Sequence, residues 1–130
     1  MHRNGWWLTP AGPTLDAGAF LVGLEYATGV RATIVGKPSP TFFRLAADRL
    51  AAEVALAGGA RPRRRELAMV GDDVNADIAG GARVGLTTVF VESGKHGAAE
   101  LASAASRRRP VVPDAVAPSI LEVVRVLVPG

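Results

Sequence analysis

The chain has 130 residues, of which 48% are hydrophobic and 21% are charged, and its formal net charge at pH 7 is +3. This length allows one modest domain and leaves no room for two full ones. The absence of cysteine excludes disulfides, thiolate metal sites and a cysteine nucleophile. No apolar run approaches the ~20 residues of a membrane span, and residues 1–30 lack a signal-peptide pattern, so we expect a cytoplasmic protein with no membrane partner.

Two arginine clusters, at residues 61–65 and 107–109, account for much of the positive charge. Both lie beside Pro, Gly or Ala/Ser stretches that predict loops, and neither is interleaved with aromatic residues or set on a helical face. Solvated loop charge is therefore favoured. Binding of nucleic acid remains a third and much weaker hypothesis.

Residues 1–14 are rich in Trp, Pro and Gly and are expected to form an irregular lead-in. Apolar residues then recur at helical spacing, which predicts a helix that begins after Asp16 and ends near Gly29. Its apolar face contains Phe20, Leu21, Leu24 and Ala27. The β-branched residues that follow predict a short strand over residues 30–35.

A long helix is expected next. Ser39 is its predicted N-cap and Pro40 its first residue, because proline fits the first helical turn. Gly58 and Gly59 end it. The four-residue spacing of its apolar positions predicts a buried face made of Phe42, Ala46, Leu50 and Val54.

The second half of the chain alternates short strands with helices. Strands are expected at residues 67–70, 86–91 and 115–117, and helices from Val74 to Gly85 and over residues 97–105. A last helix opens with a capping-box pattern at Ser119, and its inward side chains are expected to be Leu121, Val124 and Val128. This alternation predicts an α/β domain with a mainly parallel sheet and flanking helices. Open sheets of this kind bind ligands at the carboxyl ends of their strands.

Three carboxylates gather where the strand at residues 67–70 ends. Asp72 and Asp73 follow that strand directly, and Asp77 lies about one turn into the next helix. Unpaired carboxylates that crowd together raise one another's pKa, and a hard cation such as Mg²⁺ relieves the repulsion. The alternative is a helix N-terminus with Asp73 or Asn75 as a simple cap. The cluster alone does not separate these interpretations.

Lys37 favours the metal-site interpretation, because it also follows a predicted strand and lies between Gly36 and Pro38. An ammonium at this place can reach the same sheet edge and neutralise a phosphoryl group. The alternative is an ordinary exposed loop lysine. Pro38 stands where a P-loop needs Ser or Thr, and a response-regulator order would place the lysine after the acidic pair.

Two motifs together carry a resemblance to a known family. Gly-Lys-Pro-Ser-Pro-x-Phe-Phe at 36–43 and Gly-Asp-Asp-x-x-x-Asp-Ile-x-Gly-Gly at 71–81 resemble the third and fourth motifs of haloacid-dehalogenase-like (HAD) phosphatases, in the NagD-like branch. The resemblance implies a partial three-layer Rossmann-like core. Residues 15–130 would be the C-terminal part of that core, and residues 1–14 a remnant of the cap.

The resemblance also implies a set of roles. Lys37 and Asp77 are the implied catalytic residues, and Asp72 and Asp73 the implied magnesium site. Asp72 would bind Mg²⁺, Asp73 and Asp77 would support it, and Lys37 would hold the phosphoryl group. The substrate would be a small phosphorylated metabolite.

The chain departs from the family pattern, because it contains no Asp-x-Asp, the motif that carries the family's nucleophile. The resemblance also leaves the family's central strand, its Ser/Thr motif and most of its cap without a counterpart. We therefore expect a Mg²⁺-dependent phosphomonoesterase chain that is inactive alone. The alternative is a non-catalytic HAD-like domain with an assembly or regulatory role. We also expect a homodimer, because the strand at 67–70 would lack its family partner and expose an apolar edge.

Overall fold

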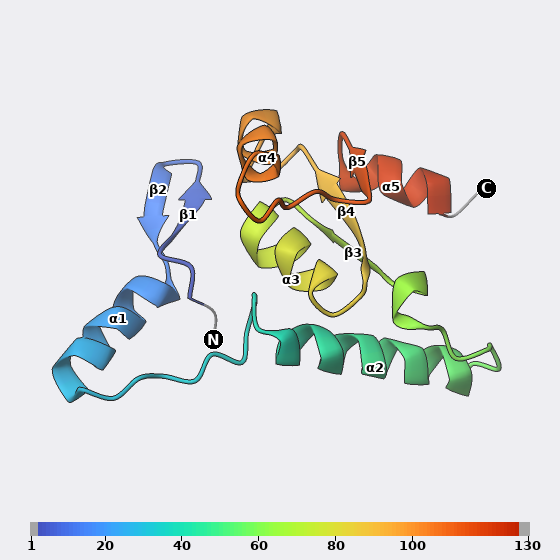
Figure 1. Cartoon of the computed structure of the whole chain (residues 1–130), viewed down its shortest axis with the longest axis horizontal. Helices are drawn as coiled ribbons and strands as arrows, with labels where there is room; N and C mark the ends of the chain where they lie inside the picture. Colours follow the sequence, from blue (N-terminus) through green and yellow to red (C-terminus); the bar gives the residue numbers. More distant parts are fainter. Residues whose placement is uncertain (1–2, 128–130) are drawn as a thin grey trace.

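The computed structural model describes residues 3–127, and Figure 1 shows the arrangement of its elements. The N-terminal part contains β1 (Trp6–Thr9), β2 (Gly12–Leu15), α1 (Ala17–Thr28) and α2 (Pro40–Leu56). A 3₁₀ turn η1 (Arg64–Glu66) leads into β3 (Ala68–Gly71), the π-helical turn η2 (Val74–Ile78) and α3 (Ala79–Ala82). The chain continues through β4 (Thr87–Val91), α4 (Ala98–Ala105), β5 (Ala115–Ala117) and α5 (Ile120–Leu127). Within residues 3–127, no helix combines the length and apolarity needed to cross a bilayer.

A three-stranded parallel sheet forms the centre of the molecule, in the order β3-β4-β5. Val70 lies opposite Val89 in the first pair of strands, and Phe90 lies opposite Val116 in the second. Helices flank the sheet (Figure 1). The predicted mixed α/β architecture with a parallel sheet is therefore confirmed. Among the described residues, the second edge of β3 has no strand beside it.

The core lies between the sheet and the helices that follow β3 and β4. Val74 and Ile78 of η2, Phe90 of β4 and Ala104 of α4 are all buried and form one cluster. Three of these side chains are large and apolar, so removing them from water is the main contribution to the stability of this half of the chain. Both ends of η2 are thereby fixed against the sheet.

The N-terminal segment differs from the prediction. Instead of an irregular lead-in, β1 and β2 form an antiparallel hairpin in which Trp6 lies opposite Leu15. Gly12 has φ of 109°, a backbone conformation that side-chain-bearing residues rarely adopt. This glycine allows the chain to reverse direction between β1 and β2. Pro10 and Pro13 interrupt the alternation of apolar and polar residues that would have predicted the two strands.

The strand predicted over residues 30–35 is absent. This stretch has no regular structure, and the backbone N–H of Ala32 donates to the Glu25 carboxylate at 2.9 Å. A strand requires a neighbour to satisfy its backbone groups. No neighbouring strand lies beside this stretch among the described residues, so its β-branched residues do not produce one.

The buried face of α2 is shifted by one residue from the prediction. Phe43 is 1% exposed and lies within a face that also contains Ala47 and Ala51, whereas Phe42 is 40% exposed and Leu50 is 47% exposed. The reason is tertiary: the Phe43 ring packs directly against Gly80 of α3, where an added Cβ would collide with the ring. Because Gly80 has no side chain, the Phe43 ring can pack against its backbone, and Phe43 is buried in place of Phe42.

Similar differences occur in the first and last helices. Leu21 is the buried member of the apolar face predicted for α1, whereas Phe20 and Leu24 are exposed. In α5 the buried side chain is Val123, and Leu121 and Val124 are exposed. Val128 lies outside the described residues. Both helices carry apolar side chains that the rest of the described chain, residues 3–127, leaves exposed.

Candidate functional site

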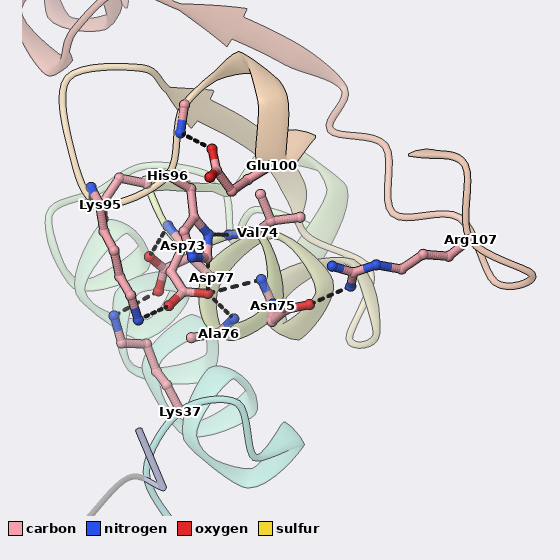
Figure 2. Close-up of polar contacts among 12 residues, drawn as sticks. Lys37, Asp73, Val74, Asn75, Ala76, Asp77, Lys95, His96, Glu100 and Arg107 are labelled. Atoms are coloured by element: carbon pink, nitrogen blue, oxygen red, sulfur yellow. Dashed lines mark hydrogen bonds and ion pairs between the residues drawn. The ribbon is translucent and has the colours of Figure 1, made fainter. Parts of the chain in front are cut away.

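The candidate site lies at the carboxyl ends of β3 and β4. β3 ends at Gly71 and is followed by Asp72 and Asp73. The loop after β4 contains Lys95, and the loop before α2 contains Lys37. Figure 2 shows both lysine side chains directed toward the aspartates of η2 and its N-terminus. Parallel pairing of β3 with β4 brings the segments that follow these two strands to one edge of the sheet.

Lys37 and Asp77 form an ion pair across 40 residues of sequence, with 2.7 Å between Lys37 Nζ and Asp77 Oδ1. The Asp77 side chain is almost fully buried, and its other oxygen accepts a 3.3 Å hydrogen bond from the backbone N–H of Asp73. A buried carboxylate is costly unless it is paired. This contact therefore fixes the ammonium of Lys37 beside the acidic cluster.

Asp73 caps η2. Its Oδ1 accepts hydrogen bonds from the backbone N–H groups of Asn75 at 2.9 Å and Ala76 at 2.8 Å. Its Oδ2 lies 3.3 Å from Lys95 Nζ. Burial alone raises the pKa of Asp73, but the N–H of Ala76 and the ammonium of Lys95 together lower it below its usual value. Asp73 is therefore the N-cap of η2, which is the alternative that the sequence had left open.

Asp72 has different surroundings from Asp73. Its Oδ2 accepts a 2.5 Å hydrogen bond from the backbone N–H of Lys95. The carboxylate lies so close to Gly94 that a Cβ at that position would collide with it. Gly94 therefore lets the loop after β4 approach Asp72 and hold it at the end of β3.

The described residues can supply part of the coordination shell of a Mg²⁺ ion. Within residues 3–127, no three acidic or histidine side chains gather in a metal cage. Mg²⁺ is usually bound through one or two carboxylates and keeps several waters together with substrate phosphate. Asp72 is the hard oxygen donor that fits this chemistry. The oxygens of Asp73 are already engaged with backbone N–H groups and with Lys95.

Sequence reasoning did not assign roles to Lys95 and His96. Lys95 approaches Asp73, and its ammonium lies 4.5 Å from the centroid of a Trp6 ring. His96 Nδ1 accepts a hydrogen bond from the backbone N–H of Val74 at 3.1 Å. One signal could have found Lys95: it and Lys37 are the only lysines in the sequence, and both reach the same cluster.

The chain matches a family model described as HAD-hydrolase-like over residues 34–123. The chain belongs to this family. It is 42% identical over 85 residues to the phospholysine phosphohistidine inorganic pyrophosphate phosphatase of Xenopus laevis, a match that covers 65% of this chain and 28% of that protein. It is 35% identical over 100 residues to human haloacid dehalogenase-like hydrolase domain-containing protein 2, covering 77% of this chain and 35% of that protein.

Solved structures agree with this assignment. A p-nitrophenyl phosphatase from Archaeoglobus fulgidus is 26% identical and superposes with a TM-score of 0.69, over 95% of this chain and 44% of that one. A magnesium complex of a glycerol phosphate phosphatase from Mycobacterium tuberculosis is 21% identical and shares the fold, with a TM-score of 0.66 over 94% of this chain and 32% of that one. The chain thus spans about a third of the length of the curated relatives above. The predicted membership of the HAD-like hydrolase family is confirmed.

Proposed function

We propose that this chain carries the magnesium- and phosphoryl-binding part of an HAD phosphatase site. The observation that carries this proposal is the 2.7 Å ion pair between Lys37 and Asp77, formed beside Asp72 at the end of β3. Lys37 comes from the loop before α2, whereas the two aspartates come from the single segment that follows β3. A stabilising role alone does not require both lysines of the chain at one acidic cluster.

Each residue has a separate part in this proposal. Asp72 would be the metal ligand. Asp73 would keep Asp72 in position by capping η2. Asp77 positions the Lys37 ammonium, which would neutralise the oxygens of a bound phosphoryl group. A bound Mg²⁺ would supply further positive charge to the same oxygens.

We further propose that this chain alone hydrolyses phosphomonoesters negligibly. Transfer of a phosphoryl group to an aspartate requires a carboxylate in line with the phosphorus, and the sequence contains no Asp-x-Asp. Asp16 lies at the N-cap of α1, and Asp48 lies on α2 beside Arg64. Neither residue belongs to the acidic cluster.

We propose small phosphorylated compounds as ligands of this site. The Xenopus relative is named for phospholysine, phosphohistidine and inorganic pyrophosphate, and the Archaeoglobus protein for p-nitrophenyl phosphate hydrolysis. These compounds share a terminal phosphoryl group and differ in the group that carries it. The shared phosphoryl group is what Lys37 and the aspartates would recognise.

Amide NMR spectra of the 130-residue chain during titration with Mg²⁺ test the proposal. We expect saturable shifts at Asp72 and Lys95, whose backbone N–H bonds to the Asp72 carboxylate. Inorganic phosphate added afterwards should shift the signals of the Lys37 loop. Asp72→Asn should remove the Mg²⁺ response, because an amide is a much weaker ligand than a carboxylate.

Asp48→Asn is the matched control, because Asp48 is an exposed aspartate paired with Arg64 at 3.5 Å on another part of the molecule. It should leave the Mg²⁺ response unchanged. Equal Mg²⁺ responses in the wild-type chain and in Asp72→Asn would refute the proposed metal site. Mg²⁺-dependent phosphatase turnover by this chain at ~1–1000 per second would refute its inactivity.

A further inference from the structure

A cavity of about 420 Å³ lies beside the acidic cluster. Its wall is made of Trp7, Leu8, Asp72, Ser93, Gly94 and Lys95. The first two residues belong to β1, and the others belong to the segments that follow β3 and β4. The cavity therefore has a polar side at the sheet edge and an apolar side at the hairpin.

The hairpin is fixed in this position from two directions. On the strand itself, the ring of Trp6, which lies opposite Leu15, is 4.5 Å from the Lys95 ammonium, a cation–π contact. At its base, Asp16 N donates to Gly5 O at 3.0 Å and Gly18 N donates to Asn4 O at 2.9 Å. The apolar wall of the cavity is thus attached both to α1 and to the candidate site.

The two apolar side chains of this wall remain accessible to ligand. Trp7 is 53% exposed and Leu8 is 56% exposed. Small-molecule sites are concave, mostly apolar and equipped with a few polar groups, with volumes of about 300–1000 Å³. An indole and a leucine opposite a carboxylate and an ammonium match that description.

We propose that this cavity holds the organic part of a phosphorylated ligand, and that it selects a neutral, flat, apolar group such as an aromatic ring. This inference rests on the proposed function, because the phosphoryl group would lie at Asp72 and the lysines. The Trp7 indole can stack on a ring. The apolar side of the wall, Trp7 and Leu8, favours an uncharged organic group, because a charged group would lose its hydration there without a partner.

Calorimetric titration of the 130-residue chain at saturating Mg²⁺, with phenyl phosphate and methyl phosphate as probes, tests the inference. We expect phenyl phosphate to bind about tenfold more tightly, which is the scale of one aromatic stacking contact. Trp6 and Trp7 are the two tryptophans of the chain. Their fluorescence should therefore change with phenyl phosphate much more than with methyl phosphate.

Three substitutions locate the ring. Trp7→Ala should bring the ratio of the two affinities close to one, whereas Trp7→Phe should keep most of the preference because it retains an aromatic ring. Tyr26→Ala is the control, since Tyr26 is a 91% exposed aromatic residue on α1 outside the cavity, and it should leave the ratio unchanged. If Trp7→Ala does not fold, Leu8→Ala should lower the ratio in its place.

The outcomes separate the inference from the function on which it rests. If both probes bind equally to the wild-type chain, the cavity does not hold the organic group, while the phosphoryl site stands. A preference for phenyl phosphate that survives both Trp7→Ala and Leu8→Ala would place the ring elsewhere and overturn the inference. Binding of neither probe would overturn the proposed function and the inference together.

Discussion

Both lysines of this chain reach the same acidic segment, because each ammonium contacts a carboxylate of the residues that follow β3. Lys37 pairs with Asp77 and Lys95 pairs with Asp73. Every other basic side chain that could deliver positive charge is an arginine or a histidine. Lysine carries a compact charge on a flexible stem, so it can neutralise a carboxylate in one state and a phosphoryl oxygen in another.

Asp73 provides a prediction at the scale of a single residue. Its pKa is lowered in the folded chain, so its carboxylate contributes stability above its unfolded pKa of ~3.9, and that contribution is lost as the pH falls through the folded value. Asp73→Ala also removes the cap of η2 and should cost about 1–2 kcal/mol at pH 7. Urea unfolding at pH 7 and pH 3 should show a smaller loss at the lower pH.

Asp73→Asn is the matched variant, because asparagine caps helices nearly as well as aspartate. It should keep more of the stability at pH 7 than Asp73→Ala does. A loss from Asp73→Ala that is the same at pH 7 and pH 3 would contradict the role assigned to the charged form.

At the scale of elements, α2 is fixed against α3 by one close contact. The Phe43 ring lies on Gly80, where a Cβ would collide with it, and Phe42 makes an edge-to-face contact with Phe43 at 5.3 Å between ring centroids. Phe43 is fully buried and Phe42 is 40% exposed. The two adjacent phenylalanines therefore contribute very differently to the free energy of unfolding.

We predict that Phe43→Ala costs about 3–5 kcal/mol in the free energy of unfolding, as expected for a fully buried phenylalanine. Phe42→Ala should cost clearly less, because water already reaches part of its ring. Urea unfolding of the two variants measures the difference. Equal losses would mean that α2 packs with the face expected from its periodicity, and the position assigned to Gly80 would be wrong.

At the scale of the whole molecule, β3 presents an unpaired edge within residues 3–127. An apolar groove of about 110 Å³ lies between this strand and α2, and its lining includes Phe42, Leu50 and Met69. Exposed strand edges tend to pair with another chain. Arg65 precedes β3 and Asp72 follows it, so antiparallel pairing of two copies would place opposite charges near each other.

We therefore predict that the 130-residue chain forms a symmetric dimer through β3 at micromolar concentration, since self-complementary surfaces pair in this way. Light scattering measures the mass. Ala68→Lys, a charge placed on the free edge, should yield a monomer, whereas Ala115→Lys on β5, at the opposite side of the sheet, should leave the dimer intact. A monomeric wild-type chain would contradict the prediction.

The sequence by itself determined the features that depend on local chemistry. Pro40 set the start of α2, and the apolar runs before Asp72 and Glu92 set β3 and β4. The alternation of these strands with helices set the parallel sheet. Helix caps, helix-ending glycines and short apolar runs act within a few residues. The motifs at 36–43 and 71–81 indicated the family for the same reason, because each is one short segment with its own spacing.

Only the tertiary structure decided which groups meet. Periodicity predicted an apolar face for α2, but the contact between Phe43 and Gly80 selected the neighbouring face. The segment at 30–35 has the composition of a strand and lacks a partner beside it, and the tryptophans near the N-terminus formed a hairpin that reaches Lys95. Side-chain burial and ion pairing depend on residues far apart in sequence, and a single local pattern contains no information about the partner that completes it.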